Sequence, residues 1–170
     1  MMHALGRNTF AELLSFSSGD DPAAQLRSFR GAAKGAYVQT LEASAVAGRD
    51  HLLFTLKQTI ELGESGQLLA EKAEVDFLLR VAGTAQISKA VRIAGSKPKS
   101  PSVLVVFGRR ADVRTCVSSI SRLAELTRFA PGSPGAKAVA RLSKREVESV
   151  VDGKEALPHL LVEKAALLRR

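Results

Sequence analysis

The stretch from residue 73 to residue 108 constrains the fold of this chain more than any other. Within it, residues 75–81 alternate apolar and polar side chains, which is typical of a half-buried strand. Residues 84–94 carry apolar side chains at helical spacing, and Gly95 follows as a stop signal. Residues 102–108 form a short apolar run, as expected of a strand buried on both faces. The stretch therefore predicts a strand, a helix and a second strand. We expect Thr84 to cap this helix, with a buried stripe of Ile87, Ala90, Val91 and Ala94.

The segments before this stretch are predicted with the same signals. Residues 10–16 could form two turns of helix before a cluster of turn residues, and we expect residues 1–25 to be a partly disordered extension. Residues 37–42 suit a strand. Residues 50–62 suit a helix with Asp50 as its N-cap.

Downstream, a helix is expected from Asp112 to about Arg128, with Cys116 on its apolar stripe. Residues 136–142 suit a short edge strand. Ser143 and Glu146 then form a capping-box pattern that begins a short helix. The last helix is predicted to begin at about Pro158, since proline is well tolerated in a first turn.

The charge of the chain favours an acidic partner. Its formal net charge is +8 and its pI about 10.1, as is common for proteins that bind RNA, DNA or an anionic membrane surface. The sequence has no run of 18 apolar residues and no signal-peptide pattern, so we expect a soluble, cytoplasmic protein. A single cysteine, Cys116, excludes an internal disulfide and suits a small buried apolar residue.

The sequence carries no recognisable catalytic motif. It lacks a phosphate-binding loop, a dinucleotide fingerprint, a nucleophile elbow and a metalloprotease helix. His3, His51 and His159 have no partner at ligand spacing. Asp76 and Arg80 fall on one face of the predicted strand, where a cross-strand ion-pair network is the simplest interpretation. We therefore expect no enzyme activity, no cofactor and no metal.

Four cations in and after the predicted central helix suggest a phosphate-binding surface, although a merely solvated face is the alternative. They are Lys89, Arg92, Lys97 and Lys99. The chain has one Tyr, no Trp and seven Phe, most of them in apolar runs, so an extended platform for stacking bases is not expected. Clamping of the backbone, or a small pocket for a few nucleotides, fits better.

Four segments, in the same order, resemble the small accessory subunit of the KEOPS complex, the family of the human PRPK-binding protein. The resemblance covers residues 26–170, and its last segment is similar to the closing helix of the archaeal members. The segments are Asp50-His-Leu-Leu53, Asp76-Phe-Leu-Leu-Arg-Val-Ala-Gly-Thr-Ala-Gln-Ile-Ser-Lys-Ala90, Gly95-Ser-Lys97 and Leu161-Val-Glu-Lys-Ala-Ala-Leu-Leu168.

This resemblance implies a non-catalytic role. KEOPS makes the threonylcarbamoyl modification of the adenosine beside the anticodon, with a catalytic subunit, an atypical kinase/ATPase and small accessory proteins. The subunit resembled here binds the kinase and captures tRNA by its single-stranded 3′ CCA end. The implied fold is α+β: a single domain over residues 26–170, with a small, mostly antiparallel sheet surrounded by about five to six helices. Neither DNA nor a membrane is an expected partner.

The resemblance also suggests which residues act. The expected tRNA contacts are His51, Lys57, Arg80, Gln86, Lys89 and Lys97. His51 and Gln86 could instead be local caps, and Arg80 a structural ion pair. Lys57 is expected on a helix packed beside the central one, with a groove between them directed at the strand. The expected kinase contacts are on the last helix, at Leu160, Leu161, Ala165 and Leu168.

One position departs from the family pattern. The family motif reads Gly-any-Arg-Gln-Ile, whereas this chain has Gly83-Thr-Ala-Gln-Ile87, so Ala85 replaces the arginine. If that arginine contacts RNA, binding is weaker here or uses Arg80, Lys89 or Lys97 instead; if it is structural, Ala85 is harmless. Two other functions stay open: a generic basic RNA-binding protein outside KEOPS, and a small-molecule enzyme with a dispersed site.

Overall fold

The computed structural model describes residues 2–130, 135–143, 145–146 and 156–168. The chain divides into two units, each built from two separate segments. Unit 1 contains residues 1–43 and 96–130, and unit 2 contains residues 44–95 and 131–170. The chain first leaves unit 1 and enters unit 2 at a short 3-10 turn, Ala43–Ala45. We describe each unit by itself.

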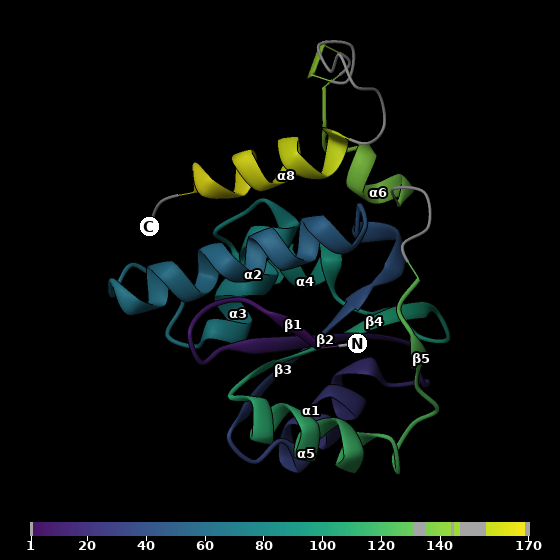
Figure 1. The fold of residues 1–170 in the computed structure, drawn as a ribbon. Helices are drawn as coiled ribbons and strands as arrows, with labels where there is room; N and C mark the ends of the chain where they lie inside the picture. Colours follow the sequence, from purple (N-terminus) through teal and green to yellow (C-terminus); the bar gives the residue numbers. More distant parts are fainter. Residues whose placement is uncertain (1, 131–134, 144, 147–155, 169–170) are drawn as a thin grey trace. The chain divides into compact units, whose positions relative to one another are not determined.

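Unit 1 is built on an antiparallel sheet (Figure 1). Its strands lie in the order β1-β2-β4-β3, and the short β5 also pairs with β2. In the central strand β4, every residue from Ser102 to Phe107 is buried, so both faces of the strand are covered, as predicted. The strands are β1 (Met2–Ala4), β2 (Phe10–Ser17), β3 (Ala36–Glu42), β4 (Pro101–Gly108) and β5 (Thr127–Arg128).

The N-terminal segment corrects two predictions. Residues 10–16 belong to strand β2 and not to a helix, and residues 2–4 form β1. Strand β2 pairs with β4 along its whole length, from Phe10 opposite Gly108 to Ser17 opposite Pro101. Residues 1–25 are therefore not a separate extension, because β2 is an inner strand of the sheet. Long-range strand pairing decides the structure of this segment, and local propensity does not report it.

Helices α1 (Pro22–Ala32) and α5 (Arg110–Ile120) pack on one face of this sheet (Figure 1). Asp21 caps α1 by accepting a hydrogen bond from the Ala24 amide at 2.9 Å. Burial raises the pKa of Cys116 to about 11, and this thiol packs as the small apolar residue expected from the sequence. The buried core between the helices and the sheet consists of Leu14, Phe16, Phe29, Val38, Leu104, Val106, Val113, Cys116 and Ile120.

Helix α5 is shorter than predicted. It ends at Ile120 instead of about Arg128, in a sequence with three serines between residues 118 and 121. Serine side chains offer the backbone local alternatives to the helix. The chain then returns to the sheet, where Thr127 and Arg128 pair with β2 as β5.

Unit 2 is helical in the part of the chain that the structure describes. Helix α3 contacts α2, α4 and α8, and α8 runs along α2 (Figure 1). Residues 75–81, predicted as a strand, lie in helix α3 (Ala73–Ala82), in which eight of the ten residues are buried: Glu74, Asp76, Phe77, Leu78, Leu79, Arg80, Val81 and Ala82. The helices are α2 (Arg49–Glu64), α3 (Ala73–Ala82), α4 (Ile87–Ala94), α6 (Ala136–Val139) and α8 (Leu157–Ala166).

Two smaller corrections concern unit 2. The helix predicted at residues 50–62 is present, but its N-cap is Gly48, and Asp50 lies in the first turn. Residues 136–139 form helix α6 where an edge strand was predicted. The start of α6 lies against the backbone of residue 46, because the amide of Gly135 donates to the carbonyl of Val46 at 2.9 Å.

The predicted capping box at Ser143 and Glu146 is confirmed, and most of the short helix predicted after it lies outside the described residues. The Ser143 amide donates to Glu146 Oε2 at 2.6 Å, and the Glu146 amide donates to Ser143 Oγ at 3.2 Å, which is a reciprocal capping box. These hydrogen bonds, together with the hydrogen bond and charge of Lys164, lower the pKa of Glu146 to about 2. Pro158 lies in the first turn of α8. The described residues hold seven α-helices, and the α+β class with a small antiparallel sheet is confirmed.

Candidate nucleic-acid interface

Helix α4 owes its direction to the turn that ends α3. Gly83 adopts the left-handed conformation, with φ 66° and ψ 37°, and its amide donates to the Arg80 carbonyl at 3.0 Å. The Thr84 amide donates to the Leu79 carbonyl at 3.1 Å. Thr84 Oγ1 accepts from the Gln86 amide at 3.3 Å. The predicted cap at Thr84 is therefore displaced by two residues, because α4 begins at Ile87 with Gln86 in the N-cap position.

The apolar stripe predicted for α4 is buried at only half of its positions. Ala90 and Ala94 are fully buried, whereas Ile87 is 55% exposed and Val91 49% exposed. Alanine lets two helices approach closely, so the two alanines suffice to pack α4 against α3. The sequence pattern could not show that Ile87 and Val91 face solvent.

Two cations lie on the exposed side of α4. Lys89 and Arg92, at i and i+3, are both exposed, and neither forms an ion pair with another residue in the described part of the chain. Gln86 is exposed at the N-terminus of the same helix, and its side chain makes no capping hydrogen bond. By helical spacing Lys89 and Arg92 lie on one flank of the exposed surface of α4, and Ile87 and Val91 lie on the other flank. We call Gln86, Ile87, Lys89, Val91 and Arg92 the α4 face.

His51 is not accessible in this structure. It is fully buried, and its Nδ1 accepts a hydrogen bond from the Ala47 amide at 3.2 Å, so the local cap is the role that the structure shows. Burial, and then the nearby charge of Arg141, lower the pKa of His51 to about 3. A neutral imidazole without exposed surface cannot contact RNA phosphates, which corrects the expected tRNA contact.

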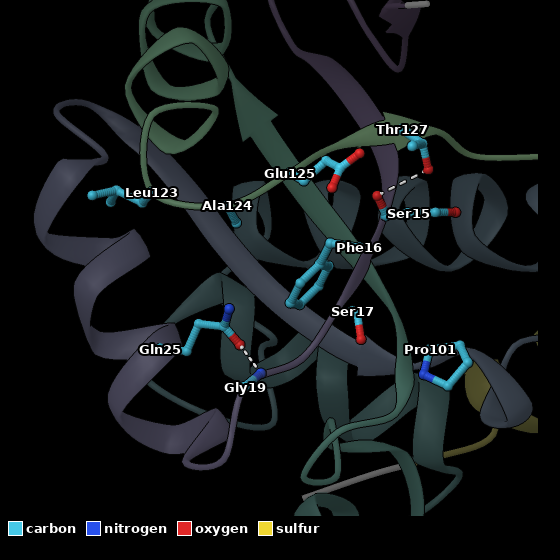
Figure 2. A pocket seen from close by; sticks show the side chains of 10 residues that line it. All are labelled: Ser15, Phe16, Ser17, Gly19, Gln25, Pro101, Leu123, Ala124, Glu125 and Thr127. Carbon is cyan, nitrogen blue, oxygen red and sulfur yellow. Dashed lines mark hydrogen bonds between the residues drawn. The ribbon is translucent and has the colours of Figure 1, made fainter.

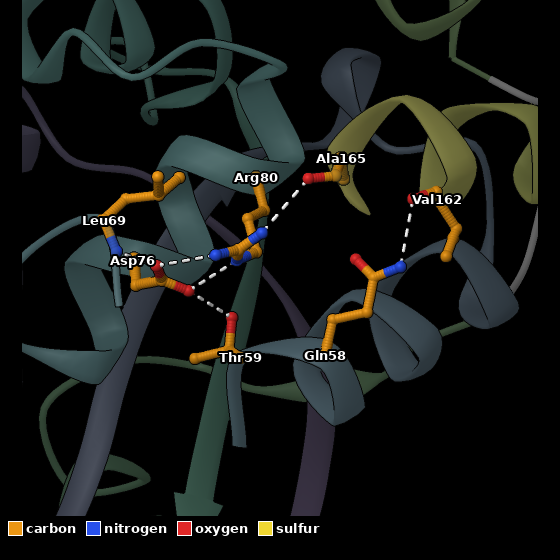
Figure 3. A network of polar contacts seen from close by, with 7 residues as sticks. All are labelled: Gln58, Thr59, Leu69, Asp76, Arg80, Val162 and Ala165. Carbon is orange, nitrogen blue, oxygen red and sulfur yellow. Dashed lines mark hydrogen bonds and ion pairs between the residues drawn. The ribbon is translucent and has the colours of Figure 1, made fainter. Parts of the chain in front are cut away.

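Arg80 is also buried, within a network of polar groups inside unit 2 (Figure 3). Its Nε donates to Asp76 Oδ2 at 2.7 Å, and its Nη1 donates to the Ala165 carbonyl of α8 at 3.1 Å. Asp76 also accepts from Thr59 Oγ1 at 2.8 Å and from the Leu69 amide at 2.7 Å. The expected RNA contact at Arg80 is thus corrected to a structural ion pair.

This ion pair differs from the one predicted. Asp76 and Arg80 lie at i and i+4 on helix α3 and not on a strand, and their charges join α3 to α2 and α8. Buried charges of this kind need several hydrogen bonds to offset the loss of water. The i, i+4 spacing of an acid and an arginine was the sequence signal for a helix here.

The remaining expected RNA contacts fall in different places. Lys57 is exposed on α2 and lies 3.9 Å from Glu61, which is a weak surface pair. Helix α3 contacts both α2 and α4, so a helix and not the predicted strand lies beside these two helices. Lys97 belongs to unit 1, where its carbonyl accepts from the hydroxyls of Ser18 and Ser100.

The four expected kinase contacts on α8 differ in how deeply they are buried. Leu161 and Ala165 are buried and pack within unit 2, whereas Leu160 and Leu168 are partly buried. The first two are therefore core residues and are not free to meet a partner. The opposite side of α8 is exposed at positions that share one helical face, namely His159, Glu163, Ala166 and Leu167. Leu167 is 79% exposed.

Unit 1 contains a cavity of about 540 Å³ that sequence reasoning missed (Figure 2). Phe16, Leu123 and Ala124 give it an apolar lining, and Gln25 lines it near Gly19, whose amide donates to Gln25 Oε1 at 3.0 Å. Glu125 is the one ionisable residue of its lining. The lining residues are distant in sequence, so no local signal could have revealed this cavity.

In the described part of the chain, no three His, Cys, Asp or Glu side chains are grouped closely enough to hold a metal ion. No described helix has the length and apolar character needed to cross a membrane. No protein-family model matches the chain, and no curated protein matches it.

Proposed function

We propose that this protein is a non-catalytic accessory subunit of a KEOPS complex, which binds tRNA by its 3′ CCA end and docks on the kinase/ATPase subunit. The resemblance over residues 26–170 supports the family. The α4 face is the observation that carries the binding role, because it combines cations that form no ion pair among the described residues with exposed apolar side chains on one helix.

The α4 face suits the chemistry of an unpaired RNA end. Lys89 and Arg92 can each pair with a phosphate, which supplies affinity independent of sequence. Ile87 and Val91 offer apolar surface to unstacked bases, and Gln86 can donate and accept hydrogen bonds at a base edge. Such a face needs no row of aromatic residues, which agrees with the scarcity of Tyr and Trp.

The departure at Ala85 fits this proposal. Ala85 is exposed, directly before Gln86, so an arginine there would have been free to reach a bound RNA. With Arg80 buried, Lys89 and Arg92 are the exposed cations of α4 that can replace the charge of the missing arginine. We therefore infer that Lys89 and Arg92 of α4 make the phosphate contacts that an arginine at position 85 would otherwise make.

Docking on the kinase is proposed for the exposed side of α8. Its buried side already packs within unit 2, so a partner would meet Leu167, Ala166 and the residues one turn earlier. An exposed leucine beside a small residue is a suitable centre for a small apolar contact. This replaces the stripe of Leu161 and Ala165 as the expected kinase surface.

The test is charge reversal on α4. Lys89→Glu with Arg92→Glu should weaken tRNA binding and reduce the slope of log K against log salt by about two, one for each lost phosphate contact. The matched control is Arg49→Glu with Lys72→Glu, which changes the net charge equally at exposed positions of unit 2 outside α4. If both double variants lose the same affinity, RNA responds only to net charge, and the generic RNA-binding function is favoured.

A further inference from the structure

Helix α5 of unit 1 carries a row of arginines that the proposed function has not used. Arg110, Arg114, Ser118 and Arg122 follow one another at intervals of four residues, which is about 6 Å of rise for each step. The helical turn continues past the end of α5, because the amides of Leu123 and Ala124 donate to the Ile120 carbonyl at 2.8 and 3.1 Å. The row therefore extends for about 18 Å along one side of the helix.

The row faces solvent because the other side of α5 is buried. Val113, Cys116 and Ile120 pack in the core of unit 1, whereas all four residues of the row are exposed. Arg110 lies over the Phe10 ring, 5.2 Å from its centroid, so the first guanidinium is held by a cation–π contact.

The charges of Arg114 and Arg122 are not neutralised within the described part of the chain, where neither forms an ion pair. Residues 96–130 carry seven Lys and Arg residues against two acidic residues, Asp112 and Glu125. Asp112 already pairs with Arg109 at 2.7 Å. The exposed side of α5 is thus cationic, and its positions outside the row are small or hydroxylated: Ala111, Thr115 and Ser121.

We propose that the α5 arginine row contacts the sugar–phosphate backbone of a double-helical arm of tRNA. This inference rests on the proposed function and adds a second contact surface to it. A row of guanidinium groups about 18 Å long, with small and hydroxylated residues between them, suits the phosphates spaced along a duplex. Because the major groove of A-form RNA is too deep and narrow for side chains to read, such contacts would be independent of sequence.

The experiment compares two RNA probes over a salt series. The first is an RNA hairpin that ends in single-stranded CCA, and the second is a short single strand that also ends in CCA but has no duplex; each is also made without its CCA. Arg114→Gln with Arg122→Gln should lower the salt slope for the hairpin by about two and leave binding of the single strand unchanged. Arg110 is left in place so that its contact with Phe10 is kept.

The control variant is Arg7→Gln with Arg49→Gln, which removes two exposed cations outside α5. The inference is overturned if the control lowers the slope for the hairpin as much, or if the α5 variant binds the hairpin like wild type. That second outcome leaves the proposed function intact when the hairpin still needs its CCA end. If neither probe needs CCA but the α5 variant still lowers the slope, the proposed end capture fails and the duplex contact stands.

Discussion

At the scale of single residues, burial separates the structural from the binding side chains. Arg80 and His51 belong to sequence segments that resemble the KEOPS subunit, yet neither has surface to offer to RNA. Their partners explain why polar side chains are retained in the interior: Arg80 joins α3 to α8 through the Ala165 carbonyl, and His51 accepts from the Ala47 amide just before α2. Sequence reasoning identified these residues but could not distinguish the two roles, because hydrogen-bonding partners depend on the folded chain.

Arg80→Ala should destabilise the protein by about 3–5 kcal/mol, because it leaves the buried carboxylate of Asp76 without its counter-ion. The free energy of unfolding, measured with urea and followed by circular dichroism, gives this value. Lys89→Ala is the control and should change stability by no more than about 0.5 kcal/mol, since its side chain is exposed. An Arg80→Ala variant that keeps wild-type stability but loses tRNA affinity would contradict the structural role.

His51 makes stability depend on pH. Its folded-state pKa of about 3 lies below the ordinary value of 6.5, so the unfolded state binds the proton first as the pH falls. The wild type should therefore lose stability below pH 6.5 by up to about 1.4 kcal/mol per pH unit, and the loss should continue toward pH 3. His51→Gln lacks this titration, so the stability difference between the two proteins should narrow between pH 7 and pH 5. Parallel pH profiles would contradict this, because they would mean that His51 has the same pKa in the folded and the unfolded state.

At the scale of elements, local periodicity predicted those segments whose burial follows a simple pattern. The strand at 102–108, the helix at 50–62 and the last helix were predicted because each has one clear hydrophobic period. Residues 75–81 were wrongly predicted as a strand because α3 packs against three other helices. Its polar positions are therefore buried too, and the hydrophobic pattern of its sequence shows no helical period. Residues 10–16 were wrongly predicted as a helix because their partner strand β4 is about ninety residues away in the sequence.

The close approach at Gly135 gives a prediction at this scale. A Cβ atom at residue 135 would overlap the Ser44 carbonyl oxygen, so Gly135→Ala must push α6 away from its place in unit 2. We expect a loss of about 1–3 kcal/mol in the free energy of unfolding, as for other overpacked sites.

Gly31→Ala is the matched control. Gly31 lies in α1, and a Cβ atom added there would meet no other atom within 4 Å, so alanine should stabilise the protein by about 0.5–1 kcal/mol through its higher helix propensity. Thermal unfolding of the two variants measures both effects. Equal and small effects of both substitutions would mean that α6 does not lie against residue 44 in solution.

At the scale of the whole molecule, charge and binding surfaces are divided between the units. The α4 face belongs to unit 2 and the α5 arginine row to unit 1, and the net charge of +8 is the sum over both. Composition predicted an acidic partner but could not say where its binding surface lies. The α4 cations were recognised from their spacing, whereas the exposure of Ile87 and Val91 follows from packing that the sequence does not encode locally.

The most direct test of the central proposal is the affinity of the purified protein for intact tRNA and for the same tRNA without its 3′ CCA. The proposed end capture predicts that trimming causes a large loss of affinity at every salt concentration of a series. Equal affinities, with a steep salt dependence, would contradict it and would leave only diffuse attraction between a cationic protein and RNA.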